Sequence, residues 1–180
     1  MAPQCRIVYV DNDPVVLVHA RALLTSTPQG ATAYLDADLR DPDTILQQAA
    51  QTLDFTQPIA IMLMGILGHI ADDDQAQSIV RRLVGGVRSG SYLTINDGTD
   101  TSAEVVEAAR IWNQSANPTY HLRSPARIAG FFDGLQLVEP GVVSPHDGAP
   151  TPSPARPASP PSSLPRSIRL VASGASRNKP

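Results

Sequence analysis

Short apolar runs alternate along this chain with longer segments in which apolar residues recur every three or four positions. The short runs predict strands, at residues 6–10, 31–35, 58–64, 91–95 and 135–143. The longer segments have helical periodicity, at residues 14–24, 42–53, 72–84, 103–114 and 125–135. Such alternation is typical of βαβ units, so the pattern predicts an α/β fold with a mostly parallel sheet and helices on both faces.

The runs at 6–10 and 58–64 are apolar without interruption, which is typical of strands covered on both faces. In the first helical segment Val16, Ala20, Leu23 and Leu24 share one side, which we expect to face the core. Four helix starts carry capping signals, and the pairs or boxes that form them are Asp13-Pro14, Asp41-Pro42, Asp72 to Gln75 and Ser124-Pro125.

Composition divides the chain near Ser144. Nine of the 17 prolines fall in residues 144–180, many of them beside Ser or Ala. A segment of this kind buries too little apolar area to offset the entropy of ordering it. We therefore expect one folded domain over residues 1–143 and a disordered tail over residues 144–180.

Charge and cysteine content narrow the classes of function. The 180 residues carry a formal net charge of −3, whereas a nucleic-acid or membrane-surface binder would show a basic patch. The single cysteine, Cys5, cannot form an internal disulfide, and the longest apolar run, residues 59–68, is shorter than the roughly 20 residues of a membrane span. We expect a cytoplasmic protein that binds neither nucleic acid nor membranes.

In an open α/β sheet ligands bind beyond the carboxyl ends of the strands. Asp11 follows the first strand, and its two carboxylate oxygens could accept both hydroxyls of a ribose. Asp38 follows the next strand and could accept from an adenine amino group, while the backbone N–H of Leu39 could donate to an adenine ring nitrogen. Asp13 is explained by helix capping alone. The two acids predict an adenosine site.

The segment HIADDD, residues 69–74, contains possible metal ligands. Its three consecutive acids do not face one way on a helix, and they lie where negative charge favours a helix start. We expect no metal there and interpret His69 as a wall of the pocket near the substrate. Catalytic residues stay unassigned, with His69 and Asp97 as open candidates.

The YVDNDP segment, residues 9–14, also resembles the acidic pocket of a receiver domain, a phosphate-accepting signalling module. That alternative needs an aspartate after the third strand and a lysine after the fifth. Gly65 follows the third strand, and the only lysine is Lys179. The alternative hypothesis for the function is therefore a receiver-like signalling or binding module without phosphotransfer chemistry.

Five blocks resemble, in order, a family of S-adenosylmethionine-dependent methyltransferases abundant in high-GC bacteria. They are VYVDNDPVVLVHARALL, TAYLDADLRDPDTIL, MLMGILGHIADDD, GSYLTINDGT and SPARIAGFFDGLQLVEPGVV. The resemblance implies a Rossmann-like three-layer sandwich, S-adenosylmethionine as cofactor and methyl transfer to a small-molecule acceptor. It implies that Asp11 and Asn12 bind the ribose and that Asp38 and Leu39 bind the adenine. It also implies that the block of residues 64–69, which includes Met64, Gly65 and His69, lines the methyl and substrate side.

Members of that family begin with a helical region, a first strand and a glycine-rich DxGxGxP loop. Only Met1 to Cys5 precede the Asp11 block here, so we expect an N-terminally truncated domain. The missing strand would lie in the centre of the sheet, between the strands that end at Asp11 and Met64. Unpaired buried backbone groups each cost about 1–3 kcal/mol, so we expect poor cofactor binding and possible inactivity. Where the family has its last strand, RSIRLVAS, residues 166–173, is the only apolar patch.

Overall fold

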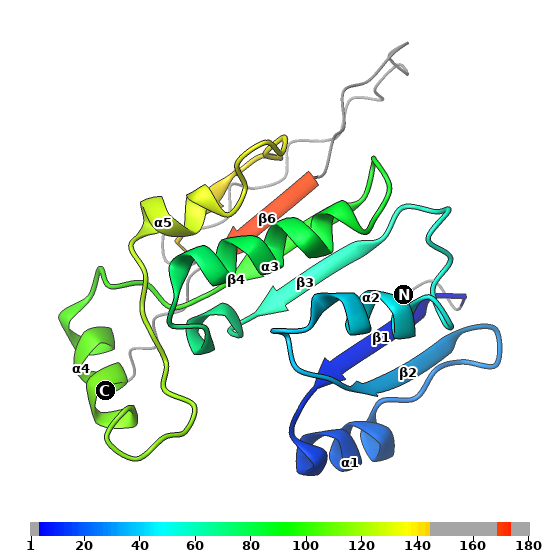
Figure 1. The fold of residues 1–180 in the computed structure, drawn as a ribbon, viewed down its shortest axis with the longest axis horizontal. Helices are drawn as coiled ribbons and strands as arrows, with labels where there is room; N and C mark the ends of the chain where they lie inside the picture. Colours follow the sequence, from blue (N-terminus) through cyan, green and yellow to red (C-terminus); the bar gives the residue numbers. More distant parts are fainter. Residues whose placement is uncertain (1–3, 145–168, 174–180) are drawn as a thin grey trace. The chain divides into compact units, whose positions relative to one another are not determined.

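The computed structural model describes residues 4–144 and 169–173 of the chain (Figure 1). Helices and strands alternate through most of this length, and every strand pairing is parallel. The predicted α/β class with parallel strands is therefore confirmed. The chain divides into two compact units, residues 1–59 with 78–88 and residues 60–77 with 89–180, which are taken in turn.

The first unit contains one βαβ arrangement followed by a helix. Its elements are β1 (Arg6–Asp11), α1 (Pro14–Leu23), β2 (Ala31–Asp36) and α2 (Pro42–Ala49). β1 and β2 form a two-stranded sheet in which Arg6 pairs with Ala31 and Asp11 with Asp36. Its buried apolar residues are Leu17, Ile45, Ala49, Ile79, Val80 and Leu83.

The capping signals act as predicted. Oδ1 of Asp13 accepts from the backbone N–H of Val15 at 2.8 Å and starts α1, and Oδ1 of Asp41 accepts from that of Thr44 at 3.1 Å and starts α2. Both helices have proline in the first turn, where the missing N–H costs nothing.

Burial in the first unit differs from the prediction at two places. β1 is half-buried to exposed along its length rather than covered on both faces, and Val10 is 38% exposed. In α1 only Leu17 is buried, while the side expected to face the core is open, with Leu23 77% exposed. Both errors have one reason: an apolar run reports what a strand or helix can bury, and burial itself depends on which elements lie against it.

The second unit contains a four-stranded parallel sheet in the order β3-β4-β6-β5. Its strands are β3 (Ala60–Met64), β4 (Tyr92–Asn96), β5 (Val142–Val143) and β6 (Arg169–Ser173). Its other elements are the short 3₁₀ helix η1 (Leu67–His69), α4 (Ala103–Trp112) and α5 (Pro125–Gly130). Its buried apolar residues are Leu63, Leu67, Ile70, Ala76, Leu93, Ile95, Ile128, Phe131 and Phe132.

Helix α3 (Asp73–Gly85) has its first turns in the second unit and the remainder in the first. Its predicted capping box is partly confirmed, because Oδ1 of Asp72 accepts from the backbone N–H of Gln75 at 2.7 Å. Ser124 likewise caps α5 by accepting from the backbone N–H of Arg127 at 3.2 Å. Among the described residues no helix is both long and apolar enough to cross a bilayer.

Three other predictions differ from the structure, two for strands and one for the tail. Residues 58–64 were expected to be covered on both faces, yet in β3 only Leu63 is buried and Met62 is 63% exposed. Residues 135–143 do not form one strand, since only Val142–Val143 do so, after a turn that closes at Gly141 with φ of +80°. Arg169–Ser173, assigned to the disordered tail, form β6 and pair with β4 and β5. The rest of the tail from residue 145 lies outside the described residues, so its disorder stays a prediction.

Candidate functional site

Two predicted ligand residues lie at the carboxyl ends of the neighbouring strands β1 and β2. Asp11 is the last residue of β1, and its Oδ1 accepts from the backbone N–H of Asp13 at 2.9 Å. Within the described part of the chain, Oδ2 of Asp11 receives no hydrogen bond. One carboxylate oxygen is thus used to shape the turn, and the other remains able to accept from a ligand.

Asp38 follows β2 and is connected to the Asp11 turn through Asn12. The side-chain amide of Asn12 lies 3.5 Å from Oδ2 of Asp38, at the outer limit for a hydrogen bond. Oδ1 of Asp38 also accepts from the backbone N–H of Arg40 at 2.8 Å, and the Arg40 guanidinium lies 3.3 Å from both carboxylate oxygens. Leu39, which lies between Asp38 and Arg40 in the sequence, is half-buried. The structure therefore brings Asp11, Asn12, Asp38 and Leu39 to one end of the two-stranded sheet.

The sequence analysis did not single out Arg40. Its guanidinium forms a partly exposed ion pair with Asp38, so the carboxylate has a compensating positive charge beside it. The signal that could have found it is the spacing Asp-x-Arg after a strand, which allows a turn and an ion pair at once.

The second group of predicted residues follows β3 in the other unit. Met64 ends that strand with its side chain largely exposed, and Gly65 turns the chain with φ of +67°, a conformation that favours glycine. The backbone N–H of Gly65 donates to the carbonyl of Asn96 at 2.6 Å, which ties this turn to the end of β4. His69 ends η1 and is half-buried.

His69 contacts a loop that is distant in sequence. Its Nδ1 lies 3.1 Å from the backbone carbonyl oxygen of Thr119, and its ring meets the ring of Tyr120 edge-on at 5.1 Å between centroids. The backbone N–H of His121 donates to the carbonyl of Gly68 at 2.7 Å. The loop at 119–121 therefore lies along η1 and orients the His69 ring.

Asp97, the other open candidate, is a buried carboxylate directly after β4. It is only 3% exposed, and its Oδ1 accepts from the Tyr120 hydroxyl and from the backbone N–H of Gly98. Its Oδ2 is buried and has no hydrogen-bond partner among the described residues, although the guanidinium of Arg123 lies 3.9 Å away. Burial raises the pKa of Asp97 above its usual range, and the hydrogen bond from Tyr120 opposes that rise.

Arg123, which is 4% exposed, connects this carboxylate to η1 and α3. Its guanidinium donates to the carbonyls of Leu67 and Ile70 at 2.8 and 2.5 Å and to Oδ1 of Asp73 at 2.7 Å. That hydrogen bond lowers the pKa of Asp73. The second oxygen of Asp73 accepts from Arg127 at 2.6 Å.

These contacts explain the acids of the HIADDD segment without a metal. Asp72 caps α3, Asp73 pairs with two arginines, and Asp74 points into solvent. Sequence reasoning did not find Tyr120, Arg123 or Asp73, because their partners lie about 20 to 55 residues away and the loop at 117–123 has no periodicity.

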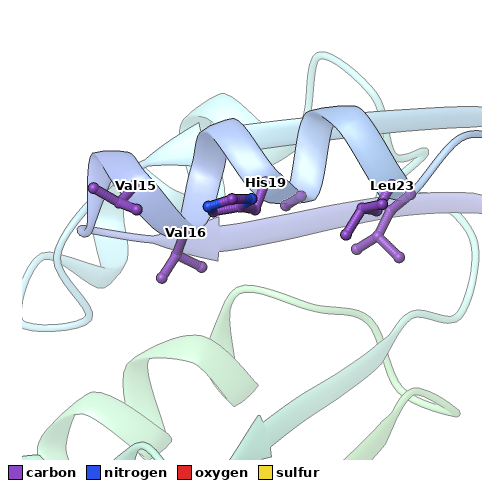
Figure 2. Close-up of a pocket in the computed structure, with 6 residues that line it drawn as sticks. Val15, Val16, His19 and Leu23 are labelled. Carbon is purple, nitrogen blue, oxygen red and sulfur yellow. The ribbon is translucent and has the colours of Figure 1, made fainter.

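A separate apolar hollow lies on α1, lined by Val15, Val16, His19, Ala20, Leu23 and Leu24 (Figure 2). The view shows Val15, His19 and Leu23 following one another along the helix. None of the predicted ligand residues lines it, so it is not part of the candidate site.

Comparison with known proteins gives a family for the chain's sequence and fold. A family model described as S-adenosyl methyltransferase matches residues 1–171. A crystal structure of a DUF574 family protein from Streptomyces avermitilis MA-4680 is 45% identical, with a TM-score of 0.76, over 83% of this chain and 58% of that one. A protein from Thermobifida fusca YX, provisionally assigned as a methyltransferase, is 37% identical, with a TM-score of 0.65, over 76% of this chain and 51% of that one.

The chain thus spans little more than half the length of these two proteins. No curated protein matches it. The receiver-like alternative receives no support from these comparisons.

Proposed function

This chain belongs to the S-adenosyl methyltransferase family, and from that premise we propose that the protein transfers a methyl group from S-adenosylmethionine to a small-molecule acceptor. When bound, the cofactor supplies an electrophilic methyl group on a sulfonium. The family membership supports the use of this cofactor. The residues that bind it are proposed below. We also propose a cytoplasmic location, with neither nucleic acid nor membranes as partners.

Asp11 and Asn12 are proposed to bind the ribose. The supporting observation is the Asp11 carboxylate, in which one oxygen is used by the Asp13 backbone and the other receives no hydrogen bond from the described residues. A ribose hydroxyl is a donor that fits such an oxygen, and a hydrogen bond to an ionised acceptor contributes about 1.5–3 kcal/mol.

Asp38 and Leu39 are proposed to bind the adenine. Asp38 has acceptor capacity toward an amino group, and the turn in which Oδ1 of Asp38 accepts from the Arg40 backbone fixes the chain at Leu39. The ion pair with Arg40 is partly exposed and contributes little to stability. Its proposed role is to hold the carboxylate in one orientation toward the adenine.

Met64, Gly65 and His69 are proposed to lie on the methyl and acceptor side. The exposed side chain of Met64 offers an apolar surface, and the glycine turn lets a ligand approach the backbone closely. Methyl transfer depends mainly on holding the acceptor in line with the sulfonium, so these residues would act by positioning.

We further propose that this chain by itself binds the cofactor weakly. In the described residues β1 pairs only with β2, and β3 pairs only with β4. Each of these strands therefore has one edge without a strand partner, and such edges are less rigid than paired ones. A ligand contact at the end of either strand loses affinity when that strand is not held in place.

Calorimetric titration with S-adenosylhomocysteine tests this proposal. The chain is compared with a longer form that carries a preceding strand and a DxGxGxP loop, and we expect tight binding only by the longer form. In that form Asp11→Ala should weaken binding at least tenfold, because about 1.4 kcal/mol corresponds to a factor of ten. Asp13→Asn removes the same charge two residues away, retains a capping side chain and should leave affinity unchanged.

Each outcome has a distinct meaning. If the longer form does not bind S-adenosylhomocysteine, the assignment of the cofactor is wrong. If Asp11→Ala and Asp13→Asn behave alike, the ribose contact is wrong while the cofactor assignment stands. Micromolar binding by the 180-residue chain alone would contradict the expected loss of affinity.

A further inference from the structure

We propose that the apolar hollow on α1 is the docking site for a helix of a longer polypeptide that contains this chain. That helix presents apolar residues at positions i and i+4 and one polar side chain opposite His19. The proposal concerns an interaction surface and goes beyond methyl transfer, since none of the proposed cofactor residues lines the hollow.

Helix α1 has almost no polar side. Of its ten residues, PVVLVHARAL, only His19 and Arg21 are polar. A helix that is apolar on nearly all sides is usually buried. Here Leu17 is buried, whereas Val15 and Leu23 are more than half exposed. The composition of α1 therefore predicts that a further element covers this helix, in addition to its own sheet.

The hollow is a groove between two rows of side chains. One row is Val15, His19 and Leu23, which Figure 2 shows one after another along the helix, and the other row is Val16, Ala20 and Leu24. Residues four apart form ridges, and the ridge of a second helix packs between them when two helices cross at about −50°. Ala20 has a small side chain in the middle of its row, which allows close approach. A helix with its own i, i+4 ridge fits this shape.

The groove is held in place at both ends of α1. Oδ1 of Asp13 caps the first turn, and the Tyr34 hydroxyl donates to the carbonyl of Leu24 just after the last turn. The Tyr34 ring stacks on that of Tyr9 in β1, with 5.6 Å between the centroids and 14° between the planes. The helix is thus fixed to its sheet, and a preorganised groove loses less entropy on docking.

His19 adds a requirement on the docking helix. Its side chain is exposed and lies among aliphatic side chains of the hollow. A polar group that is buried without a hydrogen bond costs free energy. The docking helix must therefore carry one hydrogen-bonding side chain within reach of His19, in a ridge that is otherwise apolar.

The size of the hollow favours a segment of the same polypeptide over a second copy. The aliphatic side chains of Val15, Val16, Leu23 and Leu24 are between 41% and 77% exposed. Covering them removes roughly 100–300 Å² of apolar surface per partner from water. Stable complexes bury about 800 Å² per partner, so association through the hollow alone is weak. A helix on the same polypeptide docks on a smaller area, because linkage gives it an effective concentration in the millimolar range.

The lengths of the two solved relatives indicate where such a helix could come from. This chain covers 58% and 51% of them, although 83% and 76% of this chain is matched. Each relative therefore has a long segment without a counterpart here. A helix of that segment is the proposed occupant of the hollow.

The test measures how fast diethyl pyrocarbonate modifies each histidine, by peptide mass spectrometry at low micromolar protein. A longer form is made by joining to this chain the segment of the Streptomyces avermitilis relative that it lacks, in the order of that protein. We expect His19 to react at least tenfold more slowly in the longer form than in the 180-residue chain. His121, an exposed histidine that does not line the hollow, should change less than twofold.

Two variants of the longer form locate the protection. Ala20→Glu places a charge in the groove and should return the reactivity of His19 to within threefold of its value in the 180-residue chain. The matched control is Val18→Glu on the same helix, at a position that is 62% exposed and does not line the hollow, and it should keep His19 protected. Circular dichroism of both variants in the 180-residue chain checks that the substitutions leave it folded.

Each other result would overturn the proposal. Equal reactivity of His19 in the two forms would mean that no helix docks there. Slow reaction of His19 already in the 180-residue chain would make another part of this chain the occupant, and tenfold protection that appears only as the concentration of that chain rises would make a second copy the occupant. Equal protection of His19 and His121 would mean general shielding. No cofactor enters the test, so its result is independent of S-adenosylhomocysteine binding and of the proposed methyl transfer.

Discussion

Asp73 and Asp97 are two carboxylates near one guanidinium, that of Arg123, and their surroundings move their pKa values in opposite directions. Asp73 is partly exposed and receives a hydrogen bond from Arg123 at 2.7 Å, which lowers its pKa. Asp97 is buried, with Arg123 at 3.9 Å and one oxygen that receives no hydrogen bond from the part of the chain that the structure describes, and burial raises its pKa. The direct hydrogen bond therefore outweighs the effect of desolvation on the pKa only for Asp73, the more exposed of the two carboxylates.

The lowered pKa of Asp73 gives a prediction for stability against pH. Because the folded-state pKa lies below the unfolded value of 3.8, the stabilisation is complete above pH 4 to 5 and is lost as pH falls through the folded-state pKa. Asp73→Asn should lower the free energy of unfolding at pH 7 by about 1–2 kcal/mol, because it weakens a hydrogen bond to the buried Arg123. Below pH 4 the difference between the two proteins should shrink.

Urea unfolding at pH 7 and at pH 3 measures this difference. The matched control is Asp74→Asn, since the neighbouring side chain is 102% exposed and lies 4.0 Å from Arg127. It should change the free energy of unfolding by less than about 0.5 kcal/mol at either pH. If Asp73→Asn lowers the free energy of unfolding equally at both pH values, the contact depends on the shape of the Asp73 side chain rather than on its charge.

At the scale of elements, local chemistry predicted where helices begin. Asp13, Asp41 and Ser124 each cap a helix with proline in its first turn, and all three were readable because the cap and its partner lie within three residues. The positions of Asp11 and Asp38 at strand ends were readable for a similar reason, since Asp11 directly follows an apolar run and Asp38 lies three residues after the end of the next one.

Features that depend on distant partners were not readable. The exposed side of α1 and the exposure of β1 depend on what lies against them, and the sequence of an element does not contain that information. The loop at 119–123 has no apolar period, yet it supplies Thr119, Tyr120 and Arg123 to the surroundings of His69 and Asp97. The candidate site was therefore predicted at the strand ends and missed in the loop.

The contact between η1 and this loop gives a prediction at Gly68. A Cβ atom there would lie 2.4 Å from two ring carbons of Tyr120, whose hydroxyl is bonded to Asp97 and whose backbone is bonded to Asn113. The ring cannot move away without breaking those bonds. Gly68→Ala should lower the free energy of unfolding by about 1–3 kcal/mol, the usual cost of overpacking, measured by urea unfolding.

The control for that substitution is Gly130→Ala at the end of α5, where a Cβ atom meets nothing within 4 Å. Alanine there should be neutral or stabilising by up to about 1 kcal/mol, because glycine is a poor helix former. In Gly68→Ala the ¹⁵N signals of His69 should also shift, since the loop that orients its ring is displaced. If the two variants are equally stable, the loop at 119–121 moves away from residue 68 at little cost in free energy.

At the scale of the whole molecule, both units present surface that folded domains usually cover. β1 and β3 each have one edge without a strand partner among the described residues. Val15, Val18 and Leu23 of α1 are more than half exposed, and an apolar hollow follows the helix (Figure 2). Exposed apolar patches and open strand edges both favour association with other chains.

The chain should therefore associate in a concentration-dependent way, and the apolar side of α1 should contribute. The double variant Val15→Glu with Leu23→Lys places charge on that side, with each sign at the helix end that favours it. Sedimentation velocity across a tenfold range of concentration should show less association for this variant than for the unmodified chain.

The control is Val106→Lys, which adds a charge at a half-exposed valine of α4 that does not line the hollow. It should associate as the unmodified chain does. If both variants reduce association equally, a charged side chain at any exposed apolar position is sufficient and α1 has no special part. If neither does, the unpaired edges of β1 and β3 are the remaining candidates, and association should then respond to proline placed in those strands, because proline removes a backbone donor from the edge.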